Sequence, residues 1–468
     1  MKEDKSKNTK KITILGAGLV GAMLGIMLRR IGYDIEIYDK RADQRKKEIV
    51  GRRSINLALS HRGWKALEFL GLTDAVNKIA MPMYGRAIHG TDGTVKYQGY
   101  GLNQEAIYSV SRKNLGELLL NTLENEEKVQ VNFEHNCLGV VIDESRVFLE
   151  TQDDKKRFSK DANLIIGTDG VFSIVRDALK DIGNVDTSEE YLEQNYRQLN
   201  LPTDSYGNWQ LDKNTLHIWP RGNYMMIALP NMDGTFTCTI FLPQKGENSF
   251  EQIKDERDLL TFFKINFSDV LSKMPDLVEE YFSSPESVLF TVKCSSWYHQ
   301  DKVVIMGDAA HGIVPFYGQG MNSGFEDCME FQALLNHTNP ETEGWENILQ
   351  NFFENRKPNA DAIATLSLEN FVEMSDKVGD ARFLLRKQIE AHLCSLYPNN
   401  WTHTYSLVAF SDVPYSQALA IKRKQDLVLD KIMEYPNIDL EWQDLNYDLW
   451  ILSQPISIHG KEKMKIAA

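Results

Sequence analysis

The segment between Ile12 and Tyr38 constrains the fold of this chain more than any other part of it. A short apolar run, Ile12–Leu15, is followed by the glycine pattern Gly16-Ala17-Gly18-Leu19-Val20-Gly21, a helical stretch from about Leu19 to Ile31, and a second strand-like run, Asp34–Tyr38. A strand, a glycine turn, a helix and a second strand form the βαβ unit of a dinucleotide-binding fold. We therefore expect an α/β protein with a Rossmann-type parallel sheet.

Each glycine of this pattern has its own role in such a unit. Gly16 makes the tight turn, Gly18 lets backbone amides approach a pyrophosphate, and Gly21 allows the helix to pack closely on the strand. Asp39 lies about 20 residues further on, where a carboxylate can accept hydrogen bonds from ribose hydroxyls. The pattern predicts a bound dinucleotide without distinguishing NAD from FAD. The alternative is a glycine turn that serves packing alone.

The composition excludes several classes of protein. With 468 residues, 42% of them hydrophobic and 25% charged, the chain is expected to be globular, with about three domains. Its net charge of −14 makes nucleic acid an unexpected partner. Five scattered cysteines without a C-x-x-C pair predict reduced thiols in a cytoplasmic protein, and no metal site is expected. Four glycines break the uncharged run Ile12–Leu28, so we expect no membrane anchor there.

Hydrophobic periodicity organises the rest of the chain. We expect helices over 54–80, over 113–124 and from about 320 onward, and strands within 128–167 and over 215–219, 224–229, 235–242 and 302–306. The expected architecture is a nucleotide-binding α/β domain that is interrupted by an antiparallel sheet and closed by helices.

A hairpin is predicted over residues 86–90 and 94–100, with Gly93 in its turn. With a three-residue loop, Arg86 lies opposite Gln98, and Tyr100 lies two positions further along the same face. The hairpin would therefore bring a cation and a phenol together.

Three further motifs bear on the cofactor. Residues Thr168–Arg176 resemble the Asp-Gly motif of the flavoprotein aromatic hydroxylases. Gly307-Asp308-Ala309-Ala310-His311 resembles their Gly-Asp motif, in which the aspartate binds a ribitol hydroxyl of FAD, and Ser111–Leu115 resembles the helix start whose arginine meets FAD. The resemblance therefore implies FAD. A carboxylate that ends a buried strand, as Asp308 does, also needs hydroxyl or amide donors.

A closer resemblance covers the chain from about residue 11 to at least residue 415. Gly51–Ser60, Leu216–Gly222 and Val314–Asn322 are very similar to signatures of the kynurenine 3-monooxygenase family. The resemblance implies bound FAD, NADPH as transient electron donor, O2 as co-substrate, and hydroxylation of L-kynurenine to 3-hydroxykynurenine through a flavin 4a-hydroperoxide, in tryptophan catabolism toward NAD. The alternatives are a flavin hydroxylase of another aromatic acid or of a quinone precursor, a flavin-binding redox sensor, and an NAD dehydrogenase.

The resemblance also implies which residues meet the cofactor. The loop Pro315, Phe316, Tyr317 and Gln319 is expected near the flavin, and no side chain is assigned as acid, base or nucleophile. Many bacterial members carry His where this chain has Tyr317, so no specific role is assigned to that side chain. The cofactor residues implied are Gly16, Gly18, Gly21, Asp39, Arg41, Arg112, Asp169, Asp308, Gly320, Met321 and Asn322.

The family's substrate contacts carry over residue by residue. Arg86 resembles the arginine that pairs with the substrate carboxylate, Tyr100 and Tyr405 resemble the tyrosines that bond the same carboxylate, and Asn370 resembles the amide at the amino-acid end. A planar guanidinium suits the two oxygens of a carboxylate. The remaining positions implied are apolar: Leu216, Ile227, Leu229, Phe241, Phe316 and Met374.

The expected domains follow from these assignments. An FAD-binding domain is expected over 11–80, 105–185 and 290–345, a β-sheet substrate domain over 81–104 and 186–289, and a helical C-terminal domain over 346–468. The chain is expected to be cytoplasmic, with no nucleic-acid partner, and its oligomeric state is left open between a monomer and a homodimer.

Overall fold

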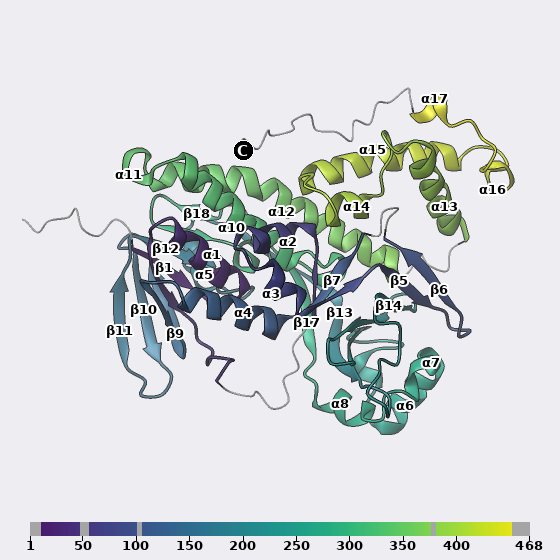
Figure 1. Cartoon of the computed structure of the whole chain (residues 1–468), viewed down its shortest axis with the longest axis horizontal. Helices are drawn as coiled ribbons and strands as arrows, with labels where there is room; N and C mark the ends of the chain where they lie inside the picture. The colour runs from purple at the N-terminus through teal and green to yellow at the C-terminus, as the bar shows by residue number, and fades with distance from the viewer. Residues whose placement is uncertain (1–10, 47–55, 101–104, 376–380, 452–468) are drawn as a thin grey trace, which may run out of the picture.

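The computed structural model describes residues 11–46, 56–100, 105–375 and 381–451 of the chain. In Figure 1 a six-stranded sheet with its helices lies on the left, a seven-stranded sheet lies at the lower right, and the C-terminal helices run along the top. The expected fold class, an α/β sheet with an inserted antiparallel sheet and a helical C-terminal region, is confirmed. Of the similarity signatures, residues 51–55 lie outside the described residues.

The six-stranded sheet contains the predicted βαβ unit. Residues Ile12 to Leu15 are all buried because helices cover both faces of the sheet, as in parallel sheets generally. Helix α1 (Leu19–Arg30) joins the first two parallel strands and packs against α4 (Arg112–Glu124) and α10 (Gly320–His337). In sheet order the strands are β18 (Tyr298–His299), β19 (Val303–Ile305), β12 (Leu164–Gly167), β1 (Lys11–Leu15), β2 (Asp34–Tyr38) and β8 (Val129–Asn132).

The seven-stranded sheet separates two apolar clusters. One face packs on α6 (Glu256–Asn266) and α8 (Leu277–Ser283), and the other packs on α12 (Trp345–Ser375) and the short helix η3 (Pro315–Tyr317). All its pairings are antiparallel except the one between β14 and β5. In sheet order the strands are β17 (Ser287–Cys294), β13 (Thr187–Leu201), β16 (Phe236–Pro243), β15 (Met225–Pro230), β14 (Thr215–Pro220), β5 (Gly85–His89) and β6 (Val95–Gly99).

One secondary-structure prediction is wrong. Residues Asn56–Leu59, expected to be helical, form strand β3, which pairs antiparallel with β7 (Ile107–Ser111) in a three-stranded sheet completed by β4 (Ala80–Met83). Pairing with a distant strand overrides the local pattern here. The helices α2 (His61–Phe69) and α3 (Thr73–Asn77) then follow as expected. Another three-stranded sheet contains β9 (His135–Val141), β10 (Arg146–Thr151) and β11 (Arg157–Asp161).

Helices form the described C-terminal region, and a cluster of buried side chains joins them. Within residues 11–451, apart from the gaps given above, no helix combines the length and the apolar character that crossing a bilayer requires. The C-terminal helices after α12 are α13 (Ala381–Leu396), α14 (Thr404–Ala409), α15 (Tyr415–Met433), α16 (Ile438–Glu441) and α17 (Asp448–Ile451). The remaining helices are α5 (Ile174–Asp181), α7 (Ser268–Leu271), α9 (Asp308–His311), α11 (Pro340–Glu343) and η2 (Phe250–Gln252).

Candidate active site

The three glycines of the turn after β1 meet different surroundings: Gly16 and Gly21 are tightly packed, and Gly18 faces open space. Gly16 has a φ of +105°, and a Cβ there would lie 2.5 Å from the carbonyl oxygen of Thr168. At Gly21 a Cβ would lie 2.0 Å from the Gly16 carbonyl oxygen, so α1 approaches the turn closely. Counting the described residues, a Cβ at Gly18 would meet only one atom within 4 Å, and no side chain caps the start of α1. Open space therefore lies before a helix N-terminus, which suits a pyrophosphate.

Asp39 and Arg41 lie beside this opening. Asp39 accepts hydrogen bonds from the Ala17 amide at 2.8 Å and from the Arg41 guanidinium at 2.7 Å. Burial opposes the charged carboxylate, but the hydrogen bonds and charge of Arg41 hold the pKa of Asp39 below its usual value. The Arg41 guanidinium lies 3.9 Å from where a Gly18 Cβ would stand. The pair thus places a half-exposed cation next to the space at Gly18.

Asp169 is already engaged by its own segment. Its carboxylate accepts hydrogen bonds from the Ser173 hydroxyl at 2.5 Å and from the Ile174 amide at 2.8 Å, at the start of α5. Burial raises its pKa, against the hydrogen bonds that it accepts. Arg112, in contrast, is exposed at the start of α4.

Asp308 lies at the carboxyl end of the parallel sheet. It follows β19 as the first residue of α9, is exposed, and makes no side-chain hydrogen bond within the described part of the chain. A Cβ on Gly320, the first residue of α10, would stand 3.9 Å from its Oδ1. Ligands of open α/β sheets bind at the carboxyl ends of the strands, and Gly16 and Asp308 lie at two such ends.

Asn322 and Met321 begin α10 beside this edge. The Asn322 amide accepts from the Ser60 backbone N–H at 3.0 Å and donates to the Ala58 and Gly318 carbonyls, each at 2.8 Å. Met321 is partly buried against the core of the parallel sheet. Asn322 thereby joins the loop before α10 to strand β3. In the part of the chain that the structure describes, the open space at Gly18, the uncapped start of α1 and the unpaired Asp308 carboxylate together fit the pyrophosphate and ribitol of FAD.

A second set of predicted residues meets across the domains. The hairpin register is as expected, with Arg86 opposite Gln98. The Arg86 Cζ lies 5.3 Å from the ring centroid of Tyr100 and 4.5 Å from that of Tyr405, and the two rings stack with centroids 5.1 Å apart. Among the described residues, the Arg86 Nε and the Tyr100 hydroxyl are buried and find no partner in good hydrogen-bond geometry. Two unmet polar groups in one place indicate a missing polar ligand.

The apolar residues expected at the substrate lie around this cation. Leu216 and Ile227 contact both of the small clusters that meet here. One cluster holds Phe241, Phe316 and Met374, and the other holds Tyr100 and Leu229, with Tyr405 packed against it. One site with a polar part at Arg86 and an apolar part is therefore formed by seven elements, namely β5, β14, β15, β16, η3, α12 and α14.

Asn370 joins the helical region to the loop before α10. Its amide nitrogen donates to the Phe316 carbonyl at 2.8 Å and lies 3.2 Å from the Met374 sulfur. The Phe316 ring stacks on Phe371 with centroids 4.2 Å apart. Asn370 thus connects α12 to η3, at the border between the two sets of predicted residues.

Tyr317 and Gln319 extend the loop toward α14 and α15. The Tyr317 ring stacks on Tyr405 with centroids 5.4 Å apart, and burial raises the Tyr317 pKa well above its usual value. Gln319 Oε1 accepts hydrogen bonds from the Tyr415 hydroxyl at 2.9 Å and from the Ser60 hydroxyl at 3.3 Å. Pro315, also in this loop, is exposed.

Sequence reasoning missed several residues of the same site. Phe371 and Phe410 pack against the predicted aromatic residues, and Ile218 lies on the same strand face as Leu216. The period-two pattern of β14 could have indicated Ile218. Nothing in the sequence signalled Phe410, because its contact with Tyr100 depends on how α14 packs on the hairpin.

Two buried histidines, His89 on β5 and His217 on β14, lie side by side. His89 Nδ1 lies 2.7 Å from Asp269 Oδ2, His89 Nε2 lies 2.9 Å from His217 Nδ1, and His217 Nε2 lies 2.9 Å from the Asp212 carbonyl oxygen. The Asp269 carboxylate and the Asp212 carbonyl oxygen are both acceptors, so each histidine donates outward from one ring nitrogen.

We expect His217 to make the fold sensitive to acid. Burial lowers its pKa to about 4, against the Asp212 hydrogen bond and with help from the charge on His89, whereas an unfolded histidine binds its proton near pH 6.5. The unfolded chain therefore binds more protons between these values, and the free energy of unfolding falls as the pH falls from 6.5 toward 4. Urea denaturation near pH 7 and near pH 4.5 should show wild type losing about 2 kcal/mol more than His217→Gln. Equal losses would contradict this expectation.

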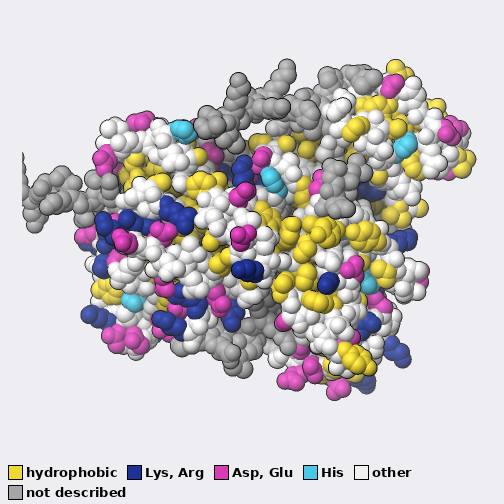
Figure 2. All heavy atoms as spheres, viewed as in Figure 1, with side chains coloured by type: hydrophobic (Ala, Val, Ile, Leu, Met, Phe, Trp, Pro, Cys, Tyr) yellow, Lys and Arg dark blue, Asp and Glu magenta, His cyan; other side chains and the backbone are white. Residues whose placement is uncertain are grey.

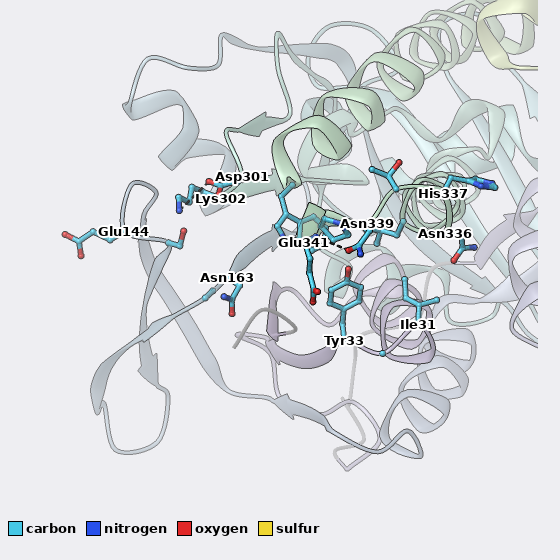
Figure 3. Close-up of a pocket in the computed structure, with 17 residues that line it drawn as sticks. Ile31, Tyr33, Glu144, Asn163, Asp301, Lys302, Asn336, His337, Asn339 and Glu341 are labelled. Carbon is cyan, nitrogen blue, oxygen red and sulfur yellow. Dashed lines mark hydrogen bonds and ion pairs between the residues drawn. The ribbon is translucent and has the colours of Figure 1, made fainter. Parts of the chain in front are cut away.

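A cavity of about 700 Å³ lies elsewhere, at the opposite edge of the parallel sheet. Its lining includes Tyr33, Asn163 and Lys302, which come just before β2, β12 and β19, and Figure 3 shows them with residues that follow α10. The amino ends of these strands point away from the glycine turn. The cavity therefore does not belong to the site that surrounds Asp308.

Comparison with known proteins agrees with this geometry. Residues 9–367 match a family described as an FAD binding domain. The chain is 42% identical over 432 residues to kynurenine 3-monooxygenase of Flavobacterium johnsoniae, covering 92% of this chain and 96% of that protein. It is 42% identical over 435 residues to kynurenine 3-monooxygenase of Dictyostelium discoideum, covering 91% and 93%.

A solved structure, the tetrameric form of 2-methyl-3-hydroxypyridine-5-carboxylic acid oxygenase, shares the fold with a TM-score of 0.65 at 19% identity, over 87% of this chain and 98% of that one. The FAD-binding monooxygenase fold and the use of FAD are thus confirmed. Because curated relatives match at about 40% identity over nearly their whole length, this chain belongs to the kynurenine 3-monooxygenase family.

Proposed function

We propose that this chain converts L-kynurenine, NADPH, H⁺ and O2 into 3-hydroxykynurenine, NADP⁺ and water. One oxygen atom of O2 enters the ring beside the amino-bearing carbon, and the other leaves as water. The observation that carries the proposal is the Arg86 guanidinium, whose buried Nε makes no hydrogen bond to the part of the chain that the structure describes, beside the Tyr100 hydroxyl in the same condition. A carboxylate of an aromatic amino acid would satisfy both groups.

The two halves of the substrate would meet different parts of the site. Arg86, Tyr100 and Tyr405 hold the carboxylate, and burial keeps the Tyr100 hydroxyl protonated as a donor because it raises the pKa of Tyr100. Asn370 lies at the amino-acid end, fixed by its bond to the Phe316 carbonyl. The aromatic ring lies among the apolar side chains, namely Leu216, Ile227, Leu229, Phe241, Phe316 and Met374.

FAD would lie along the carboxyl edge of the parallel sheet. Gly16, Gly18 and Gly21 admit its pyrophosphate at the start of α1, with Asp39 and Arg41 beside it. The further residues that we assign to FAD are Arg112, Asp169, Asp308, Gly320, Met321 and Asn322, and the loop Pro315, Phe316, Tyr317 and Gln319 would lie near both the flavin and the substrate ring. When bound and reduced by NADPH, FAD supplies the activation of O2.

The protein's own contribution is orientation and exclusion of water. Phe316, Phe241 and Phe371 form a continuous aromatic wall, with centroids 5.1 Å apart for the first pair and 4.2 Å apart for Phe316 and Phe371. Substrate anchored by its carboxylate presents the ring to the flavin side of this wall. Keeping water from the site prevents the waste of reducing equivalents as hydrogen peroxide.

The surface charge bears on the partners of the protein. Figure 2 shows Lys and Arg side chains intermingled with Asp and Glu on one face of the molecule, without a large basic patch on that face. A net charge of −14 disfavours nucleic acid as a partner, and we propose a cytoplasmic location. We propose three domains. The FAD-binding domain covers 11–80, 105–185 and 290–345, the β-sheet substrate domain covers 81–104 and 186–289, and the helical C-terminal domain covers 346–468.

Mass spectrometry tests the proposal directly. The FAD-loaded protein is incubated with L-kynurenine, NADPH and isotopically labelled O2, and the product is expected to carry one labelled oxygen at the position beside the amino group. Parallel reactions contain another aromatic acid in place of kynurenine. NADPH consumption that yields only hydrogen peroxide with kynurenine, or a product from another aromatic acid alone, would contradict the proposed function.

A further inference from the structure

Helix α14 carries Tyr405 but is too short to hold its own position. It spans only Thr404–Ala409, and isolated helices of this length are unstable in water. Tyr405 stacks between the rings of Tyr100 and Tyr317, over the Arg86 guanidinium. The position of α14 therefore decides the geometry around the cation.

Arg62, on α2, reaches the end of this helix. Its Nε donates to the Val408 carbonyl at 2.9 Å, and its Nη2 donates to the Leu407 carbonyl at 3.4 Å and to the Val413 carbonyl. The last carbonyls of a helix lack partners within the helix, and a cation is favourable beside them. A single side chain from the FAD-binding region thus caps the helix that carries Tyr405.

Arg62 is itself fixed on its other side. Its Nη1 donates to Glu326 Oε1 on α10 at 2.5 Å, and its Cζ lies 4.0 Å from the Tyr415 ring centroid. The Tyr415 hydroxyl donates to Gln319, in the loop before α10. Arg62 is 3% exposed, so water does not compete for these bonds.

We propose that Arg62 is a positioning residue for the substrate site: by capping α14 it holds Tyr405 over Arg86. This inference rests on the proposed function, since it concerns how tightly the kynurenine carboxylate is held. A guanidinium is required because three carbonyls, a carboxylate and an aromatic ring surround one side chain, and a lysine ammonium cannot reach all of them at once.

Arg62→Lys is the variant of choice, because it keeps the positive charge beside Glu326 and removes the planar set of guanidinium N–H donors. We expect the Kd for L-kynurenine to rise about tenfold, because small misplacements of a binding group have large effects. The FAD content and the catalytic rate at saturating kynurenine should change little. In the Tyr405→Ala background the same change should have almost no effect on Kd, because Arg62 acts through Tyr405.

Arg197→Lys is the matched control. Arg197 also donates to a helix carbonyl, that of Tyr281 at 2.6 Å, lies 4.8 Å from an aromatic ring centroid and faces a carboxylate, that of Glu286. It lies on β13, away from α14, so this variant should leave the Kd for kynurenine unchanged.

Hydrogen exchange separates this inference from the proposed function. Amides of Thr404–Ala409 should exchange at least about tenfold faster in Arg62→Lys than in wild type. Unchanged exchange, an unchanged Kd, or an equal rise in Kd in the presence and absence of the Tyr405 side chain would each overturn the role of Arg62. If the α14 amides exchange faster in Arg62→Lys but the wild-type protein does not bind kynurenine, the proposed function is rejected instead.

Discussion

Replacing Arg86 by Met is expected to weaken L-kynurenine binding by about 100-fold or more, because it leaves a desolvated carboxylate without its charged partner. Arg86 lies against Tyr100 and Tyr405, and its buried Nε makes no hydrogen bond within the described ranges of the chain. The loss of a charge that the fold has already desolvated costs more than the loss of a surface ion pair. The Kd of Arg86→Lys for L-kynurenine should fall between those of wild type and Arg86→Met, because lysine restores the charge without the paired guanidinium donors.

The measurement is the Kd for kynurenine, read from the change in the flavin spectrum on titration, with FAD content measured in each variant. Lys96→Met is the control, since it removes one cation from the same hairpin at an exposed position on β6. It should leave the Kd within about twofold of wild type. An Arg86→Met protein that retains FAD and binds kynurenine as wild type does would show that the carboxylate lies elsewhere.

Local sequence patterns predicted the parts of the site that depend on nearby residues. The glycine turn, α1 and β2 were predicted almost to the residue, because a strand, turn and helix in succession determine one another. The pairing of Arg86 with Gln98 followed from the length of one loop. Strand β3 was missed because its pairing with β7 depends on a segment about 50 residues away, which no local pattern reveals.

The residues that join distant segments could not be predicted in this way. Arg62 stands in an ordinary amphipathic helix, and its role is visible only once α14, more than 300 residues later, packs against it. The stack of Tyr317 on Tyr405 likewise joins a loop to a helix of another region. The family resemblance supplied Tyr405 and Asn370 as substrate contacts, whereas their mutual arrangement required the fold.

The second large effect is expected at Asp308, whose replacement by Ala should weaken FAD binding by about 10- to 100-fold. Asp308 follows β19 at the edge that holds the glycine turn, and its carboxylate makes no side-chain hydrogen bond within the described part of the chain. An exposed carboxylate at this position is free to accept bonds from the ribitol hydroxyls. Asp308→Asn keeps one acceptor oxygen, so it should weaken FAD binding less than Asp308→Ala does.

Asp301→Ala is the matched control, because Asp301 precedes the same strand at the opposite edge of the sheet and is also exposed. Each protein is purified, its flavin content is read from the visible spectrum, and the apoprotein is titrated with FAD. Asp301→Ala should remain yellow and bind FAD as wild type does, whereas Asp308→Ala should lose flavin during purification. If Asp308→Ala stays fully yellow and its FAD affinity is unchanged, the ribitol does not depend on this carboxylate. The cofactor would then be held mainly by the glycine turn, where its pyrophosphate meets the start of α1.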